Sequence, residues 1–237
     1  MSGKTYLITG ANRGLGLEFV RQITSASADN TVIACVRSLQ GELDELKTLT
    51  ASISNKVHIV ECDTSSVSSV KKAGAEVSGL LAGGPLHYLL NNAGINAVSG
   101  QTALTMDPDD LHKHIDINVI GPSELFKALE GNLRRGSVVL NMSSGLGSCG
   151  KGIVKAATYA VSKAALNMLT VHQADVLKER GAVAIVMDPG WVKTRMGGVG
   201  AILTPEESIS GMLKTLHSVT VEESGRFYQY DGKTVPW

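Results

Sequence analysis

Six short apolar runs, separated by longer segments with a helical pattern, constrain the fold of this chain more than any other feature. The runs predict strands at residues 6–9, 31–36, 57–62, 86–91, 137–142 and 182–188. Most of them are almost continuously apolar, as expected for parallel strands covered on both faces. Helical patterns lie between them, near residues 15–26, 40–51, 66–81, 108–129 and 155–179. Repeated β-α-β units with right-handed crossovers predict an α/β fold with a doubly wound parallel sheet.

The length and the absence of a linker favour a single domain. The 237 residues are consistent with one large α/β domain or with two small ones. No linker, repeat or low-complexity tract interrupts the pattern. We therefore expect one domain over residues 1–237, with about seven strands flanked by helices and a substrate-loop region at about 191–218.

Composition excludes several classes of protein. Lys and Arg total 22 and Asp and Glu total 22, so the formal charge is zero and lacks the basic surplus of nucleic-acid binders. The three cysteines form no CxxC pair and the six histidines are scattered, so we expect neither a disulfide framework nor a metal site. No apolar run reaches the roughly 20 residues that span a bilayer, and the N-terminal segment lacks a signal peptide's apolar region. We expect a cytoplasmic protein without membrane contacts.

A glycine-rich turn follows the first predicted strand and opens the first helix. It reads Thr9-Gly10-Ala11-Asn12-Arg13-Gly14-Leu15-Gly16. Glycines at such a place let the backbone approach a pyrophosphate, which then lies at the helix N-terminus. The spacing is GxxxGxG and not the general GxGxxG, so the position between strand and helix carries the prediction of a dinucleotide site.

The second predicted strand indicates which dinucleotide binds. NAD-binding units place an acidic residue there for the ribose 2′-hydroxyl, whereas an arginine accommodates the 2′-phosphate of NADP. No acidic residue occurs between Thr31 and Gly41, Arg37 follows the strand, and Arg13 lies in the glycine turn. These two arginines favour NADP(H).

Tyr159 and Lys163 are four residues apart on a predicted helix and therefore share a face. An ammonium group near a phenol stabilises the phenolate and lowers the tyrosine pKa from about 10. We therefore expect Tyr159 to act as an acid near neutral pH.

Several polar loops follow the predicted strands at one edge of the sheet. They contain Gly10–Gly16, Asn91–Gly94, Ser143–Ser144 and Pro189–Gly190. Each taken alone fits an ordinary turn or strand end. Ligands of open parallel sheets bind beyond the carboxyl ends of the strands, so the convergence of these loops with the Tyr159 helix predicts an active site there.

Together these motifs resemble the short-chain dehydrogenase/reductase family. The matching segments are TGxxxGxG at 9–16, NNAG at 91–94, the serine pair at 143–144, YxxxK at 159–163 and PGWVKT at 189–194. Finer details, including Tyr230-Asp231-Gly232 near the C-terminus, are most similar to the Sniffer and C-factor-like carbonyl reductase branch. The resemblance implies a Rossmann fold and NADPH-dependent reduction of an aldehyde or ketone, with a small-molecule carbonyl compound as substrate.

The resemblance also implies roles for single residues. Tyr159 matches the proton donor, Lys163 the lysine that lowers its pKa and holds the nicotinamide ribose, and Ser144 the serine that hydrogen-bonds the carbonyl. Asn118 matches the asparagine that supports the lysine and a proton-relay water. The implied cofactor-binding residues are Gly10, Asn12, Arg13, Gly14, Leu15, Gly16, Arg37, Asp63 (adenine), Asn92, Ala93, Gly94, Tyr159, Lys163, Pro189, Gly190, Val192 and Thr194 (the last and Val192 at the carboxamide).

One departure from the family pattern concerns the spacing before the tyrosine. Ser144 and Tyr159 are 15 residues apart, where many family members have about 13, and the added residues lie in a glycine-rich extension at 147–152. A loop joins the two residues, so both are still expected to meet. Whether Ser143 shares the role of Ser144 stays open at this point.

Two other functions fit the same fold. One is a non-catalytic sensor that binds NADP(H), which the retained Asn118, Ser144, Tyr159 and Lys163 disfavour. The other is a C-factor-like signalling protein whose role depends on a partner. The segment 196–203 is short and is expected to be a flexible lid. The small residues Ala160, Ala164 and Ala165 fit either a homodimer or homotetramer contact or burial within one chain.

Overall fold

Seven parallel strands form one sheet in the computed structural model, which describes residues 3–237. The first two residues of the expected domain 1–237 lie outside the described residues. The strands are β1 (Thr5–Thr9), β2 (Thr31–Val36), β3 (Lys56–Glu61), β4 (Tyr88–Asn91), β5 (Val138–Met142), β6 (Val183–Asp188) and β7 (Phe227–Gln229), in the order β3-β2-β1-β4-β5-β6-β7. All six strands located from the sequence are present, and the expected doubly wound parallel sheet is confirmed.

The helices differ from the sequence prediction in two places. They are α1 (Gly14–Ala26), α2 (Asp44–Ala51), α3 (Val67–Leu81), α4 (Pro108–Ile115), α5 (Gly121–Leu129), α6 (Ala157–Lys178) and α7 (Pro205–Ser218). The helix expected at 40–51 begins only at Asp44. The segment expected as one helix at 108–129 contains a π turn at Asp116–Ile120 between α4 and α5.

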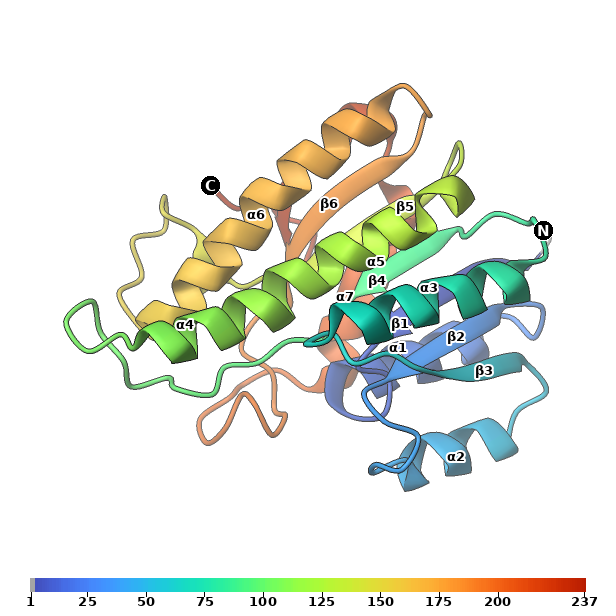
Figure 1. Ribbon diagram of the computed structural model, residues 1–237, viewed down its shortest axis with the longest axis horizontal. Coiled ribbons are helices and arrows are strands. Elements are labelled where there is room, and N and C mark those ends of the chain that lie inside the picture. The colour runs from blue at the N-terminus through green and yellow to red at the C-terminus, as the bar shows by residue number, and fades with distance from the viewer. Residues whose placement is uncertain (1–2) are drawn as a thin grey trace.

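Helices cover both faces of the sheet (Figure 1). Figure 1 shows α3, α4, α5 and α6 in front of the strands, and α1 and α7 behind them. Alternate strand residues point to opposite faces, so Ile8 packs with the α1 and α7 side whereas Leu7 packs with the α3, α5 and α6 side. Burial on both faces explains why the strands read as continuous apolar runs.

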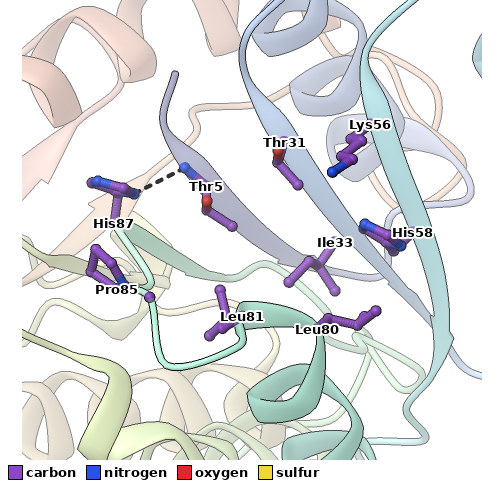
Figure 2. A pocket seen from close by; sticks show the side chains of 10 residues that line it. Thr5, Thr31, Ile33, Lys56, His58, Leu80, Leu81, Pro85 and His87 are labelled. Carbon is purple, nitrogen blue, oxygen red and sulfur yellow. Dashed lines mark hydrogen bonds between the residues drawn. The ribbon is translucent and has the colours of Figure 1, made fainter. Parts of the chain in front are cut away.

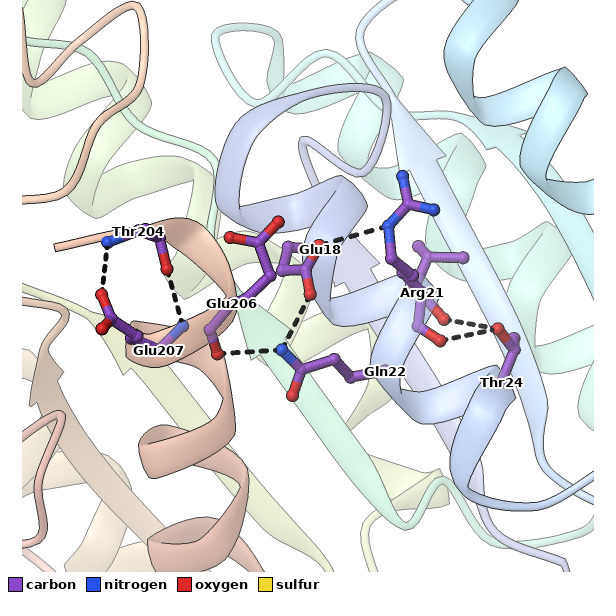
Figure 3. Close-up of polar contacts among 8 residues, drawn as sticks. Glu18, Arg21, Gln22, Thr24, Thr204, Glu206 and Glu207 are labelled. Atoms are coloured by element: carbon purple, nitrogen blue, oxygen red, sulfur yellow. Dashed lines mark hydrogen bonds and ion pairs between the residues drawn. The ribbon is translucent and has the colours of Figure 1, made fainter.

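A polar joint fixes α7 against α1 (Figure 3). Gln22 of α1 donates to Glu18 Oε1 at 2.8 Å and to the backbone oxygen of Glu206 at 3.0 Å. The first turn of α7 is closed by a capping box, in which Thr204 and Glu207 hydrogen-bond each other's backbone. Because α1 begins at the glycine turn and α7 follows the loop after β6, the joint holds these two loops at the same edge of the sheet.

The region expected to carry the substrate loop, 191–218, consists of two structurally different parts. Residues 205–218 form α7, and only residues 191–203 form an irregular loop. Within residues 3–237, no helix combines the length and the apolar character that crossing a bilayer requires.

Candidate active site

The strand order reverses between β1 and β4. The loops after β1, β4, β5 and β6 all leave the sheet at the carboxyl ends of these parallel strands, which we call the carboxyl edge. A reversal of this kind opens a crevice beyond the carboxyl ends of the strands. The sequence-predicted site residues come from these loops and from α6, which packs against β6 and the short turn Gly145–Gly147.

The glycine turn has a backbone shape that side chains would block. Gly10 and Gly14 have φ angles of +66° and +54°, and a Cβ atom on Gly16 would lie 2.1 Å from the Gly10 oxygen. Arg13 precedes α1 in an extended conformation, and its side chain does not cap the helix. The first N–H groups of α1 are thus available to an anion, so the turn fits the phosphates of a dinucleotide.

Thr9 and Asn92 fasten the loop after β4 to the end of β1. Thr9 Oγ1 accepts hydrogen bonds from the backbone N–H groups of Asn92 at 3.0 Å and Ala93 at 2.9 Å. The Asn92 amide donates to the Thr9 oxygen at 2.8 Å. Asn92 therefore stabilises the loop that carries Ala93 and Gly94 beside the glycine turn.

Lys163 is buried at the centre of the site. Its side chain reaches from α6 to the end of β5, where Nζ donates to the Met142 oxygen at 2.8 Å. Nζ lies 5.5 Å from the centroid of the Tyr159 ring. Gly94 approaches closely, since a Cβ there would lie 3.3 Å from Nζ. Burial lowers the pKa of Lys163 to about 7, because the charged ammonium loses its hydration.

Tyr159 is also buried, and its pKa is raised. Burial is the largest cause, the Asp188 carboxylate adds to it, and a hydrogen bond with Ser144 acts in the opposite direction. The expected lowering of the Tyr159 pKa by Lys163 is therefore not observed in this chain by itself. The reason is that burial dominates the Tyr159 pKa and also lowers the pKa of Lys163, the charge that would stabilise the phenolate.

The two serines after β5 have different surroundings. Ser143 is buried and donates to Asn167 Oδ1 at 2.6 Å. Ser144 is half-buried, accepts from the Leu146 N–H at 3.2 Å, and hydrogen-bonds Tyr159. This difference favours Ser144 for contact with a substrate, whereas Ser143 holds α6 against β5.

Asn118 lies in the π turn and not in a regular helix. Its side chain accepts from the Ile95 N–H at 2.8 Å and donates to the Ile95 oxygen at 3.0 Å and to Ser162 Oγ at 2.9 Å. Asn118 therefore links the loop after β4 to the residue before Lys163. A π turn often marks a functional position, because it displaces side chains from the regular helical pattern.

Sequence reasoning did not single out Asp188, which acts on Tyr159, or Lys151, which pairs with Asp188. Asp188 ends β6 and forms an ion pair with Lys151 of the glycine-rich extension, with 3.7 Å between Oδ2 and Nζ. A Cβ on Gly145 would lie 2.8 Å from Asp188 Oδ2 and 3.0 Å from Lys151 Nζ. The only sequence signal for this pair was that Asp188 directly precedes Pro189-Gly190.

The glycine-rich extension is fixed by residues near the C-terminus. The Gly150 N–H donates to the Trp237 oxygen at 2.6 Å, and Ser148 Oγ donates to the Pro236 oxygen. The Trp237 ring packs on Phe227 of β7, with 5.7 Å between ring centroids. The two added residues thus lie in a loop that still brings Ser144 to Tyr159.

The loop after β6 is closed by its own hydrogen bonds. Trp191 Nε1 donates to the Gly197 oxygen at 2.8 Å, so the indole braces the loop. Val192 is buried and forms an isolated bridge with Leu203. Thr194 Cγ2 would lie 3.7 Å from a Cβ on Gly14, so this loop contacts the glycine turn. Gly190 has a φ angle of +78°, and the Pro189 oxygen accepts from Ser208 of α7 at 2.7 Å.

The remaining predicted cofactor residues lie at the β1–β2–β3 side. Arg37 is exposed directly after β2, and Leu15 packs on the core from the start of α1. Asp63 shapes the turn after β3 by accepting from Ser65 N at 3.0 Å and Oγ at 2.7 Å. Asn12 donates to the Glu42 oxygen at 2.9 Å, and Arg13 forms an ion pair with the Glu42 carboxylate. Sequence reasoning missed Glu42, which lies just beyond the segment Thr31–Gly41 that lacks acidic residues.

No group of three or more His, Cys, Asp or Glu residues is placed to hold a metal ion in the part of the chain from residue 3 onward. The three cysteines are free thiols, two of them buried.

The chain matches one protein family over most of its length and resembles several known proteins. Residues 4–199 match the family described as short chain dehydrogenase. The C-signal protein of Myxococcus xanthus is 38% identical over 159 residues, which is 65% of this chain and 94% of that protein. An NADPH-bound carbonyl reductase from chicken fatty liver superposes with a TM-score of 0.91 at 34% identity, and the carbonyl reductase Sniffer of D. melanogaster with 0.90 at 29%; both alignments cover 100% of both chains. The chain belongs to the short-chain dehydrogenase/reductase family.

Proposed function

We propose that this protein is an NADPH-dependent carbonyl reductase that converts an aldehyde or ketone to an alcohol. The observation that carries the proposal is the meeting of Tyr159, Lys163 and Ser144 with the glycine turn at one sheet edge. The fold neighbours add support, because two of them are carbonyl reductases and one of these has NADPH bound.

The cofactor part of the proposal depends on charge and backbone shape. The turn at Gly10–Gly16 fits a pyrophosphate, and Arg13 and Arg37 supply the positive charge that a 2′-phosphate requires. Asp63 is proposed to contact the adenine, and Val192 and Thr194 the carboxamide. NADPH, when bound, supplies a hydride to the carbonyl carbon.

The residues of the chain manage the proton and the developing charge. Tyr159 gives its phenolic proton to the carbonyl oxygen, and the Ser144 hydroxyl donates a hydrogen bond to the same oxygen. The Lys163 ammonium, 5.5 Å from the ring centroid, stabilises the phenolate that remains. Asn118 acts through others, because it holds Ile95 and Ser162 around the lysine.

The test is NADPH oxidation with a panel of aldehydes and ketones, followed by absorbance, with product chirality recorded. We expect turnover with at least one carbonyl compound and a larger kcat/KM with NADPH than with NADH. A ratio below one would overturn the assignment of NADP(H).

A second function has one specific observation in its favour. The C-signal protein is 38% identical to this chain, so a signalling role on the same fold is the alternative, as is a non-catalytic NADP(H) sensor. NADPH binding without turnover of any carbonyl compound would favour these alternatives over the reductase.

A homodimer or homotetramer stays a prediction. Ala160, Ala164 and Ala165 are only half-buried within this chain, and Met168 and Val176 on the same helix are exposed. Light scattering after size-exclusion chromatography tests it, and a monomeric mass would contradict it.

A further inference from the structure

Three separate segments of the chain meet at one carboxylate on the cofactor side of the site. Glu42 lies between β2 and α2, and its Oε2 is 3.2 Å from Arg13 Nη1. The same oxygen is 3.4 Å from Nη1 and from Nη2 of Arg195, which lies in the loop after β6. The glycine turn and the loop after β6 are thereby joined through a single acidic residue.

The ion pairs in this cluster are too exposed to be explained by stability. The side chains of Arg13, Arg195 and Glu42 are 50%, 73% and 70% exposed. Ion pairs of such exposure contribute little, because water screens them and the long side chains lose entropy. Two guanidinium groups around one carboxylate also leave a surplus positive charge at this position.

The chemistry of the cluster suits a phosphate better than a carboxylate. A phosphate monoester carries up to two negative charges and three oxygen atoms that accept hydrogen bonds from planar guanidinium groups. In the present arrangement both arginines share one oxygen atom of Glu42. A dianion would therefore replace Glu42 with a gain in both charge and hydrogen-bonding capacity.

The location of Arg195 indicates that it would bind the 2′-phosphate and not the pyrophosphate of the dinucleotide. Its neighbour Thr194 contacts Gly14 of the glycine turn, so the loop after β6 is packed next to Arg13. Arg13 is the residue of the turn that we assign to the 2′-phosphate, and Arg37 directly follows β2, five residues before Glu42. Arg195 thus shares its ion-pair partner, Glu42, with Arg13, the residue proposed to bind the 2′-phosphate. Among the residues that the structure describes, it shares no ion pair with residues near Tyr159.

We propose that Arg195 is a further residue that binds the 2′-phosphate of NADP(H), and that Glu42 is the competing anion that gathers Arg195 and Arg13. The inference rests on the proposed binding of NADP(H). Binding exchanges the two ion pairs of Glu42 for contacts between the arginines and the 2′-phosphate, so both residues determine the preference for NADPH over NADH.

Isothermal titration calorimetry of the full chain with NADPH, NADH and adenosine 2′-monophosphate tests the proposal without reference to turnover. Arg195→Ala is expected to weaken NADPH and adenosine 2′-monophosphate by about tenfold, as for the loss of a charged hydrogen bond, and to leave NADH within about twofold. Arg195→Lys should recover part of the loss, because the charge remains but the planar fork is gone. Glu42→Gln should strengthen NADPH binding and leave NADH nearly unchanged.

Arg226→Ala is the matched control, because Arg226 is also half-exposed and pairs with Glu223 at 3.6 Å but precedes β7. It should alter none of the three affinities. Equal losses for NADPH and NADH in Arg195→Ala, or no loss at all, would overturn the role of Arg195. Weaker NADPH binding in Glu42→Gln would overturn the competition. If the wild-type protein binds neither NADPH nor adenosine 2′-monophosphate, the proposed cofactor itself is refuted. Failure of the cofactor proposal is thereby distinguished from failure of the role proposed for Arg195.

Discussion

Two buried tyrosines, each beside a base whose pKa burial lowers, lie at opposite edges of the sheet. Tyr159 lies near Lys163 at the carboxyl edge, and Tyr6 lies near His217 at the amino edge. Burial raises the pKa of both tyrosines and lowers the pKa of both bases. Titration behaviour alone therefore does not distinguish them.

The partners of the two tyrosines differ. The Tyr6 hydroxyl is 3.1 Å from His217 Nε2, and its ring stacks on Tyr88 with 4.5 Å between centroids, so its polar and apolar parts are both satisfied. Tyr159 instead faces Ser144 and the loops that carry glycines. The comparison teaches that a perturbed pKa indicates chemistry only where loops suited to a ligand converge on the same group.

The amino edge does have a small hollow (Figure 2). It measures about 180 Å³ and is lined by Lys56, His58 and His87, among others. His87 Nδ1 accepts from the Thr5 N–H at 3.0 Å, as Figure 2 shows, so the ring is held by the backbone. The contrast with the carboxyl edge is that Gly84, which lines this hollow, follows the end of α3, whereas the Gly10–Gly16 turn leads into the start of α1.

The largest expected effect separates the two tyrosines directly. Tyr159→Phe should reduce turnover by about 10²–10⁴-fold, the usual contribution of a positioned proton donor, and should leave NADPH binding intact. Tyr6→Phe should retain turnover and lower the free energy of unfolding by about 1 kcal/mol through the lost hydrogen bond to His217. Steady-state kinetics and urea denaturation of both variants measure this, and equal loss of turnover in both would erase the comparison.

The two bases should make the free energy of unfolding depend on pH in different ranges. Lys163 has a pKa of about 7 in the fold against 10.5 ordinarily, so between these values the unfolded chain binds more protons and stability rises with pH. The corresponding rise for His217 ends at its ordinary value of 6.5. Lys163→Met should abolish turnover, and its gain in unfolding free energy over wild type should shrink from pH 7 to pH 9. A gain that is constant over this range, measured in urea, would show that Lys163 keeps its proton in the folded protein.

The serine pair tests the carboxyl edge at finer scale. Ser144→Ala should lower kcat by about 10²-fold, as for the loss of one donor to a developing oxyanion. Ser143→Ala should mainly destabilise the fold by about 1–3 kcal/mol, because the buried Asn167 Oδ1 loses its donor. Loss of turnover in Ser143→Ala and not in Ser144→Ala would exchange the two roles.

The smallest effect concerns the charge beside Tyr159. Lys151→Met leaves Asp188 unpaired, which raises the pKa of Tyr159 further and should move the alkaline limb of the kcat/KM profile to higher pH. Asp188→Asn should move it to lower pH, while its amide oxygen still accepts from the Gly190 N–H. A shift in the same direction for both variants would contradict an electrostatic cause.

Most of the fold was predictable because it depends on local patterns. Parallel strands such as β5 are covered on both faces and read as apolar runs, and Asp107, a residue type preferred before a helix, accepts from two N–H groups of α4. Strand β7 has only three residues, Phe227–Gln229, which is too short for a periodic signal. The π turn at Asp116–Ile120 adds no distinctive residue type, so the sequence alone does not reveal it.

In the candidate site, too, features that depend on local sequence patterns were predictable, and features that depend on tertiary packing were not. Tyr159 and Lys163 share a helix face because of their spacing, and this spacing is visible in the sequence. The contact of Glu42 with Arg195 joins residues 153 positions apart and depends on the packing of two loops. The direction of the Tyr159 pKa shift depends on the depth of burial, which no local pattern records.

The strand order has a consequence for how the chain acquires its site during synthesis. The sheet grows outward from β1, first towards β3 and then from β4 to β7. In chain order the glycine turn and β4 both precede residues 138–142, so the edge of β4 that pairs with β5 has no partner until those residues are made. An apolar open edge is prone to pair with other chains. The nascent chain therefore exposes an apolar strand edge next to the glycine turn. A chaperone that covers β4 would be most needed after β4 is made and before residues 138–142 are made.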